Sequence, residues 1–205
     1  MYESTLILVA AGGSRLKVED ALREYSATCI WTLNATRHEL EELQFEIHAP
    51  EPRNKINCGR PAIVSPFFAP TVSRPEKGAP RIPFPLDAAC DLGAPFFELS
   101  HDYMLAYAAL IHTGRLPEAA RVPGVSVRPF RRIVLCGVDM NDRHHFARSR
   151  AAHFWIGLLR GLGVEIVPAG ESTLLAGGVL VDAVIATGLR RPFFYGQPVA
   201  AGGNC

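Results

Sequence analysis

The stretch RRIVLCGVDM at residues 131–140 contains an apolar run from Ile133 to Cys136, which a glycine and then the carboxylate of Asp139 follow. A polar loop with two histidines comes next, then a helical pattern over 146–162 and a second apolar run, GVEIVP, at 163–168. A strand, a polar loop, a helix and a strand in this order are typical of a βαβ unit. Ligands of open parallel sheets bind beyond the carboxyl ends of the strands. Because Asp139 follows such an end, the stretch predicts a ligand site there.

The first 48 residues extend this pattern toward the N-terminus. Buried strands are expected from the apolar runs at 5–10, 27–33 and 44–48, with helices over 18–25 and 37–43 between them. Such a βαβαβ opening is typical of nucleotide-binding α/β proteins. We therefore predict one Rossmann-like α/β domain over 1–205, with a mostly parallel sheet flanked by helices.

Two insertions interrupt the alternation of strands and helices. Ten prolines fall in the first, at 49–95, where only a short strand at 63–65 is expected. The rest would be a lid, an interaction arm, a disordered segment, or structure that the sequence does not reveal. Its phenylalanines favour packing over the sheet edge or in an oligomer or virion contact. The second insertion, at 115–130, follows an expected helix over 102–113, and a closing helix or strand is expected near 174–186.

Composition limits the function classes. Hydrophobic residues make up 48% and charged residues 20% of the 205 residues, which fits a compact globular protein. The formal net charge of +1 gives no signal for nucleic acid, and no apolar run approaches the ~20 residues of a membrane span. Five cysteines without zinc or redox spacing, and an N-terminus without a basic signal region, favour the cytoplasm. Nine arginines between 115 and 160 could receive an anion such as a phosphate.

The first loop is a candidate phosphate site. Gly12, Gly13 and Ser14 follow a strand and precede a helix, where glycines allow close backbone approach and free N–H groups attract anions. The loop is neither a full GxGxxG motif nor a P-loop, so a plain turn is the alternative. Asn34 and His48 follow strand ends on the same edge, and Ser100 precedes a helix. Each could line a pocket, or serve as a turn or capping residue.

The loop after Asp139 is the candidate catalytic region. Asp139 could hold a ribose hydroxyl, a metal-bound phosphate or a catalytic histidine, or simply cap the turn that follows. His145 could act as a general base, and Arg143 and Arg148 could neutralise a leaving phosphate; the alternative is a solvated basic loop. No metal site is expected, because the zinc spacings are missing. His153, on an otherwise apolar helix, is expected to be a satisfied core or boundary histidine.

These motifs, taken in order, resemble those of the Rossmann-like bacterial sialyltransferases that use a CMP-sugar. The GGS loop, Asn34, Ser100 before Tyr103-Met104, and the later segments IVLCGVD and VEIVPAGESTLL carry this resemblance. The chain looks still more like small phage-encoded Rossmann-like proteins of unassigned function, through FEIH at 45–48 and YG at 195–196. The resemblance implies that Gly12, Gly13, Ser14, Asn34 and Ser100 line a nucleotide pocket. The family's catalytic histidine aligns with Arg148, so His145 would have to replace it.

Two functions remain open. The first is binding of a nucleotide or nucleotide sugar, with glycosyl-type group transfer as the reaction and the nucleotide sugar as donor. His145 would be the base, Asp139 would orient it or a sugar, and Arg143 and Arg148 would stabilise the departing phosphate. The alternative is a non-catalytic phage virion or host-interaction protein that uses the fold as a scaffold. In either case a phage protein would occupy the host cytoplasm or the virion.

Overall fold

The computed structural model describes residues 4–27, 29–34, 36–48, 61–67, 80–93, 97–125, 127–139, 148–170 and 172–175. These residues form an α/β fold around one seven-stranded sheet in which every pairing is parallel. The strands are β1 (Thr5–Val9), β2 (Cys29–Leu33), β3 (Leu43–Glu46), β4 (Ala62–Val64), β5 (Arg81–Pro83), β6 (Arg132–Cys136) and β7 (Glu165–Pro168). The prediction of a Rossmann-like α/β fold is confirmed.

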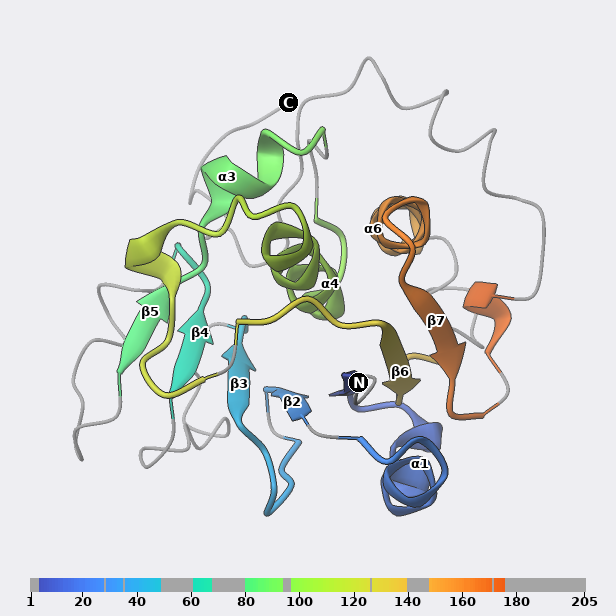
Figure 1. Ribbon diagram of the computed structural model, residues 1–205. Helices are drawn as coiled ribbons and strands as arrows, with labels where there is room; N and C mark the ends of the chain where they lie inside the picture. Colours follow the sequence, from blue (N-terminus) through green and yellow to red (C-terminus); the bar gives the residue numbers. More distant parts are fainter. Residues whose placement is uncertain are drawn as a thin grey trace, which may run out of the picture.

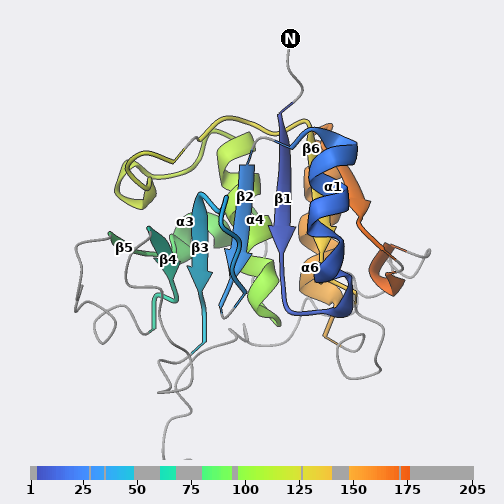
Figure 2. The same cartoon turned by 90° about the horizontal axis from the view of Figure 1, so that it is seen from below.

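The strand order β5-β4-β3-β2-β1-β6-β7 contains one reversal of direction. The chain adds strands outward from β1 to β5 and then returns to place β6 on the other side of β1. All strands point the same way, so their carboxyl ends share one edge (Figure 2). The reversal between β1 and β6 is the topological switch point, where open α/β sheets bind their ligands.

Helices cover both faces of the sheet (Figure 1). Helix α1 (Val18–Tyr25) lies on one face, packed with Ile7, Val9, Val134 and Cys136. Helices α3 (Leu86–Cys90), α4 (Ser100–His112) and α6 (Arg150–Gly161) lie on the other. Strands covered in this way are apolar on both sides, which explains why β1 and β6 read as continuous apolar runs.

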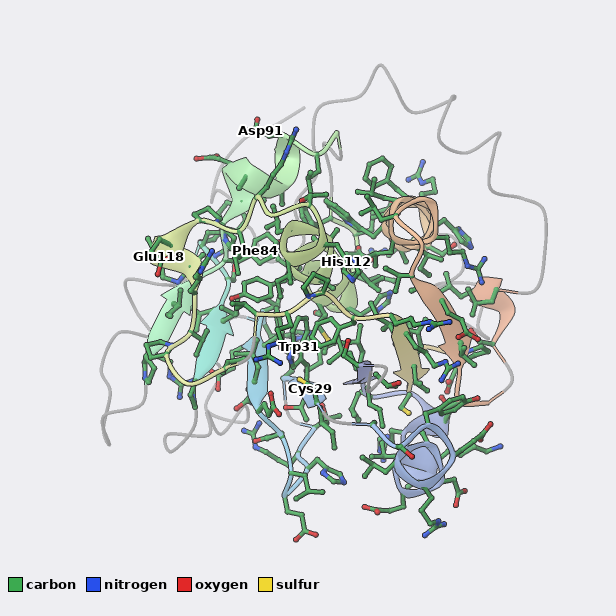
Figure 3. All side chains as sticks on the ribbon, in the orientation of Figure 1. Cys29, Trp31, Phe84, Asp91, His112 and Glu118 are labelled. Atoms are coloured by element: carbon green, nitrogen blue, oxygen red, sulfur yellow. The ribbon has the colours of Figure 1, made fainter. Side chains whose placement is uncertain are left out.

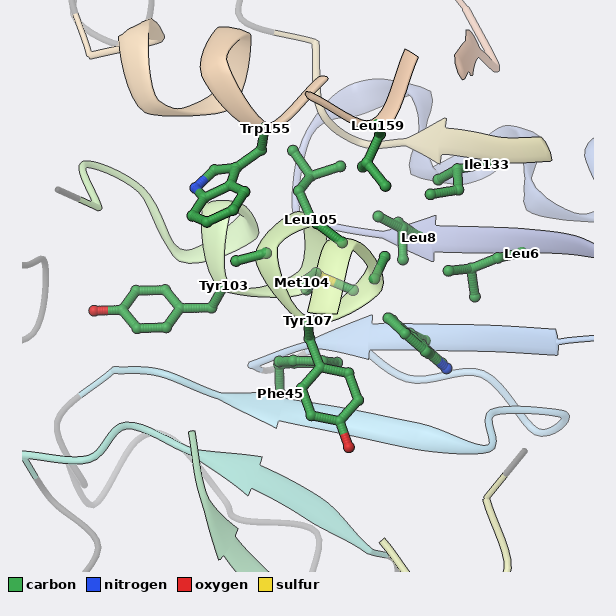
Figure 4. Packing of buried hydrophobic residues seen from close by; sticks show 14 of the residues in the cluster. Leu6, Leu8, Phe45, Tyr103, Met104, Leu105, Tyr107, Ile133, Trp155 and Leu159 are labelled. Atoms are coloured by element: carbon green, nitrogen blue, oxygen red, sulfur yellow. The ribbon is translucent and has the colours of Figure 1, made fainter. Parts of the chain in front are cut away.

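Aromatic side chains fill the layer between the sheet and α4. Trp31 on β2 meets Phe45, Tyr107 and Phe130, with each pair of ring centroids 5.5–5.6 Å apart. Trp31 and Phe84 point into this layer (Figure 3), and Figure 4 shows Tyr107 on α4 facing Phe45 and the strands. Trp155 on α6 is fully buried beside them. Because α4 is surrounded in this way, eleven of its residues beyond Ser100 are buried.

The expected helix over 37–43 is wrong. Residues 36–38 and 41–42 have no regular structure, and 39–40 form a turn. The Glu41 carboxylate accepts hydrogen bonds from Thr32 Oγ1 at 2.7 Å and from the His38 backbone nitrogen at 3.3 Å. These bonds hold the connection against β2 in a non-helical conformation, because short polar contacts to the backbone compete with helical ones.

The range 49–95 contains a strand and a helix that could not be predicted from its proline-rich sequence. Besides β4, which fits the strand expected at 63–65, the described part of this range includes β5 and α3. Pro83 ends β5 at the sheet's outer position, where a missing N–H is tolerated. The second insertion contains the 3-10 helix η2 (Glu118–Ala120), and Tyr107 Oη donates to the Ala120 carbonyl at 2.7 Å. Within the described residues, no helix combines the length and the apolar character that crossing a membrane requires.

Candidate functional site

The loops that follow β1 and β6 are joined by direct hydrogen bonds. The Ser14 backbone nitrogen donates to Asp139 Oδ2 at 2.9 Å, and Ser14 Oγ also donates to Asp139 Oδ1. The Gly137 backbone nitrogen donates to Ser14 Oγ at 2.7 Å. Ser14 lies in the 3-10 helix η1 (Gly13–Lys17), which leads directly into α1. Ser14 and Asp139 therefore meet at the switch point.

Glycines allow these two loops to approach so closely. The Gly12 nitrogen donates to the Gly137 carbonyl at 2.9 Å, and a Cβ on Gly12 would lie 2.6 Å from that oxygen and 2.7 Å from Asp139 Oδ2. Gly137 has φ +75°, and a Cβ there would overlap the Ala10 carbonyl. At Gly13 the nearest atom would be Asp139 Oδ2 at 3.6 Å, an ordinary contact. Gly12 and Gly137 are therefore needed for the close contact between the two loops, whereas Gly13 is exposed to solvent.

A third loop, after β7 (Glu165–Pro168), completes this part of the edge. The single hydroxyl hydrogen of Ser172 is shared between the carbonyls of Val138 and Asp139, which lie 3.0 and 3.1 Å from its Oγ. Gly170 lies against Ser14, since a Cβ on Gly170 would be 3.1 Å from Ser14 Cβ. No role was predicted from the sequence for Gly137, Gly170 or Ser172. A glycine directly after a strand was the available signal for Gly137.

The Asp139 carboxylate changes the expected chemistry of the first loop. An N–H group at a helix start attracts anions, but here the Ser14 N–H is already bonded to a negative side chain. A second anion in the same place would meet like-charge repulsion. Asp139 is partly exposed, and each of its carboxylate oxygens can accept a hydrogen bond in addition to the one from Ser14. The site is therefore suited to hydroxyl donors, such as those of a sugar or ribose, more than to a bare phosphate.

Asn34 and His48 form a separate group at the ends of β2 and β3. Asn34 has the left-handed φ of 51°, and its Oδ1 accepts from the backbone nitrogens of Ile47 at 2.9 Å and His48 at 3.4 Å. Thr36 Oγ1 links this turn to β1 by donating to the Val9 carbonyl at 3.2 Å. The Asn34 side chain oxygen thus fastens the two strand ends together, which is the turn role that the sequence left open.

Ser100 is the first residue of α4 and is buried, at the carboxyl edge of the sheet. Asp102 caps the start of α4. Its Oδ2 accepts hydrogen bonds from the backbone nitrogens of Leu99 at 2.7 Å and Glu98 at 2.8 Å. Glu98 in turn pairs with Arg150 at 2.7 Å and accepts from the Ala151 nitrogen at 3.3 Å, at the start of α6. Sequence reasoning did not single out Glu98 or Asp102.

The remaining predicted residues precede or belong to α6 in the sequence. Arg148 is partly exposed, in the turn before Ser149. His145 and Arg143 lie outside the described residues. His153 is buried, and its ring contacts Ser149 Oγ at 3.4 Å and the Leu174 carbonyl at 2.9 Å, which confirms it as a satisfied core histidine.

A cavity of about 450 Å³ lies away from these residues. It is bounded by the end of β5, the start of α3 and η2, and its lining is mostly proline and alanine with Phe84, Leu86 and Asp87. None of the predicted site residues lines it. Among the described residues, no group of three or more histidine, cysteine, aspartate or glutamate side chains could hold a metal ion.

Comparison with known proteins does not assign the chain to a family. No protein-family model, curated protein or solved structure matches the chain. The class that the structure itself defines is a Rossmann-like α/β protein with a polar contact at its switch point.

Proposed function

We propose that the protein binds a nucleotide or nucleotide sugar at the switch point between β1 and β6. One observation carries the proposal: the Gly12–Ser14 loop and Asp139 are in direct contact at the place where α/β sheets of this order bind ligands. If the protein is an enzyme, its reaction would be transfer of a glycosyl-type group from that donor.

The arrangement suggests how the ligand would lie. Ribose or sugar hydroxyls would donate to the partly exposed Asp139 carboxylate, above the outward-facing Gly13. The phosphates would lie away from Asp139, toward Arg148, because like charges repel and arginine binds phosphate in a bidentate manner. Asn34 is excluded from direct ligand contact through its Oδ1, which binds Ile47.

A thermal-shift screen against nucleotides and nucleotide sugars tests this proposal. A ligand that binds only the folded state raises the melting temperature, and the rise grows with the logarithm of the ligand concentration above its Kd. The Asp139→Asn variant should weaken the shift, while Asp91→Asn, which changes an exposed aspartate after α3, should leave it unchanged. The proposal is wrong if no nucleotide or nucleotide sugar shifts the wild-type melting temperature at millimolar concentration.

A second candidate is a non-catalytic phage scaffold, in a virion or in contact with a host protein. The same Ser14–Asp139 contact supports it, because this contact satisfies the loop without any ligand. If no nucleotide in the screen shifts the melting temperature of the wild type, this candidate is favoured.

A further inference from the structure

The loop after β7 is fastened to the switch point at two positions. The hydroxyl of Ser172 is shared between the carbonyls of Val138 and Asp139, at 3.0 and 3.1 Å. Gly170 lies against η1, because a Cβ on it would be 3.1 Å from Ser14 Cβ. The loop therefore contacts both partners of the Ser14–Asp139 hydrogen bond, and its position affects the shape of the proposed site.

The next turn of the same loop is attached to α6. Leu174, in the 3-10 helix η3 (Thr173–Leu175), buries its side chain in the core. Its carbonyl oxygen lies 2.9 Å from His153 Nε2, and its backbone nitrogen donates to Ser172 Oγ at 3.3 Å. Leu174 thus connects His153 to the hydroxyl that contacts the Asp139 carbonyl.

The partners of its two ring nitrogens define the protonation state of His153. A carbonyl oxygen can only accept a hydrogen bond, so the ring must carry a hydrogen on Nε2. Nδ1 lies 3.4 Å from Ser149 Oγ, a hydroxyl that can donate. The neutral ring with its hydrogen on Nε2 makes both contacts at once. A second proton would place a positive charge on a residue that is only 7% exposed, which costs free energy.

Burial lowers the pKa of His153 below its ordinary value of 6.5, and the hydrogen bond to the Leu174 carbonyl opposes this shift. A ring released into water would regain the ordinary pKa, so protons favour release. The held arrangement is therefore fully stable above pH ~6.5 and weakens as the pH falls from there toward the lowered pKa. Other charged or titratable groups on α6 at this end, or on the segments next to it, are Arg148, Arg150 with Glu98, His101, Asp102 and Asp139.

We propose that His153 is a positioning residue of the switch-point site, which holds the loop after β7 in place through Leu174 and Ser172. This inference rests on the proposed function and adds regulation by pH to it. A loop that is already held in place lowers the ordering cost that a ligand must meet on binding. Acidification should release the loop and weaken binding, whereas at pH 7.5 the site should be complete. His153 acts only through the loop and does not contact the ligand.

Amide NMR tests the link without any ligand. His153→Leu removes the hydrogen-bond donor to the Leu174 carbonyl and leaves an apolar side chain of similar size. It should shift the amide signals along the loop and across its contact with η1, at Gly170, Ser172 and Ser14. Unmoved signals in a folded His153→Leu protein would overturn the link.

Two control variants separate positioning from a general loss of packing. His153→Gln keeps an N–H donor for the Leu174 carbonyl but does not titrate, so its loop signals should stay near their wild-type positions at pH 7.5. His112→Leu also removes a half-buried, hydrogen-bonded histidine, which accepts from the Phe130 nitrogen at 2.8 Å at the opposite end of α4. It should leave the loop signals in place; equal shifts in His112→Leu and His153→Leu would overturn the proposal.

A pH series from 7.5 to 5 tests the regulation. In the wild type the Ser172 amide signal should move as the pH falls below ~6.5, and His153→Gln should abolish this step. The other charged groups are the same in both proteins. A step that survives in the variant therefore belongs to them and would overturn the role of His153. This comparison remains decisive if His153→Leu does not fold.

Calorimetric binding of a UDP-sugar and a CMP-sugar separates this inference from the proposed function. Neither probe carries a phosphate monoester, whose second pKa of ~6 would disturb the pH series. At pH 7.5, His153→Leu should bind about fivefold more weakly than the wild type, the effect of losing one hydrogen bond. At pH 5.5 the wild type should lose affinity and His153→Gln should not.

The two failures are distinguishable. Binding that is equal in all three proteins at both pH values supports the proposed function and overturns the role of His153. Loop signals that shift as expected, with no binding of either sugar nucleotide to the wild type at millimolar concentration, overturn the proposed function and, with it, the role of His153 in ligand binding.

Discussion

The Asp139 carboxylate accepts a hydrogen bond from the backbone nitrogen of Ser14 at 2.9 Å, although 125 residues separate the two. The bond joins η1, which follows β1, to the loop after β6 at the switch point. It also places the negative charge of the Asp139 carboxylate at the start of η1. A ligand at this point must therefore supply hydroxyl donors or displace the carboxylate.

Replacement of Asp139 by alanine should destabilise the protein by about 1–3 kcal/mol, the usual cost of leaving a partly buried polar group without its partner. Both the nitrogen and the hydroxyl of Ser14 would lose an acceptor. Urea unfolding measures the effect. Asp91→Ala, at an exposed position, should change the free energy of unfolding by less than about 0.5 kcal/mol. Equal effects for the two variants would show that the Ser14 contact is not stabilising.

Gly12 and Gly13 should respond differently to alanine. A Cβ on Gly12 would lie 2.6 Å from the Gly137 carbonyl, so Gly12→Ala must push apart two backbones, at a cost of about 1–3 kcal/mol. A Cβ on Gly13 meets nothing closer than 3.6 Å, and Gly13→Ala should cost less than about 0.5 kcal/mol. Melting temperatures of the two variants compare them directly; a larger loss for Gly13 would contradict the described loop.

Local patterns in the sequence were sufficient for the strands from β1 to β4 and for β6 and β7, but not for β5 and α3. The apolar runs of β1, β2 and β6 and the pattern of α1 were visible because each element is long or strongly periodic. β4 was expected from the apolar run at 63–65, but β5 has only three residues and α3 only five, so periodicity carries little signal for these two elements.

The same limit applies to the site. Gly12, Ser14 and Asp139 were recognisable from their place after strand ends. The pairing of Asp102 with His101, and of Glu98 with Arg150, depends on how the starts of α4 and α6 lie in space. No spacing in the sequence encodes that arrangement. Asn34 was singled out correctly as a strand-end residue, but only the structure shows that its oxygen binds backbone.

An ion pair crosses the outer part of the sheet. Arg81 on β5 reaches Glu46 on β3 at 2.8 Å across β4, where Ala62 pairs with Arg81 and Val64 with Glu46, and both charged side chains are less than a tenth exposed. Arg81→Met should destabilise by about 3–5 kcal/mol, because a buried carboxylate loses its cation. Adding Glu46→Gln should recover part of the loss.

Chemical unfolding of the single and double variants measures this coupling. The matched control is Arg121→Met, which breaks the exposed pair with Glu118 (3.0 Å) and should cost at most about 1 kcal/mol. An Arg81→Met effect no larger than that of the control would show that the buried pair contributes little to folding.

Asp102 should make stability depend on pH. Its pKa of about 8 in the folded protein is above the ordinary aspartate value of 3.8, so the folded state holds the proton more tightly than the unfolded state. The stabilisation is complete below pH ~4 and is lost as the pH rises through about 8, because folding then requires a buried charge. Asp102→Asn should flatten this decline between pH 5 and 8, which unfolding curves at several pH values would record. An equally steep decline in the variant would assign it to other groups.

Isothermal titration of wild type and Gly13→Val with the best nucleotide ligand tests the central claim most directly. Gly13 faces outward, so valine should leave the fold intact but occupy the space where the ligand meets the loop. We predict measurable binding to the wild type and at least about tenfold weaker binding, or ~1.4 kcal/mol, to the variant. Equal affinity for both proteins, or no nucleotide binding to the wild type at millimolar concentration, would contradict a nucleotide site between β1 and β6.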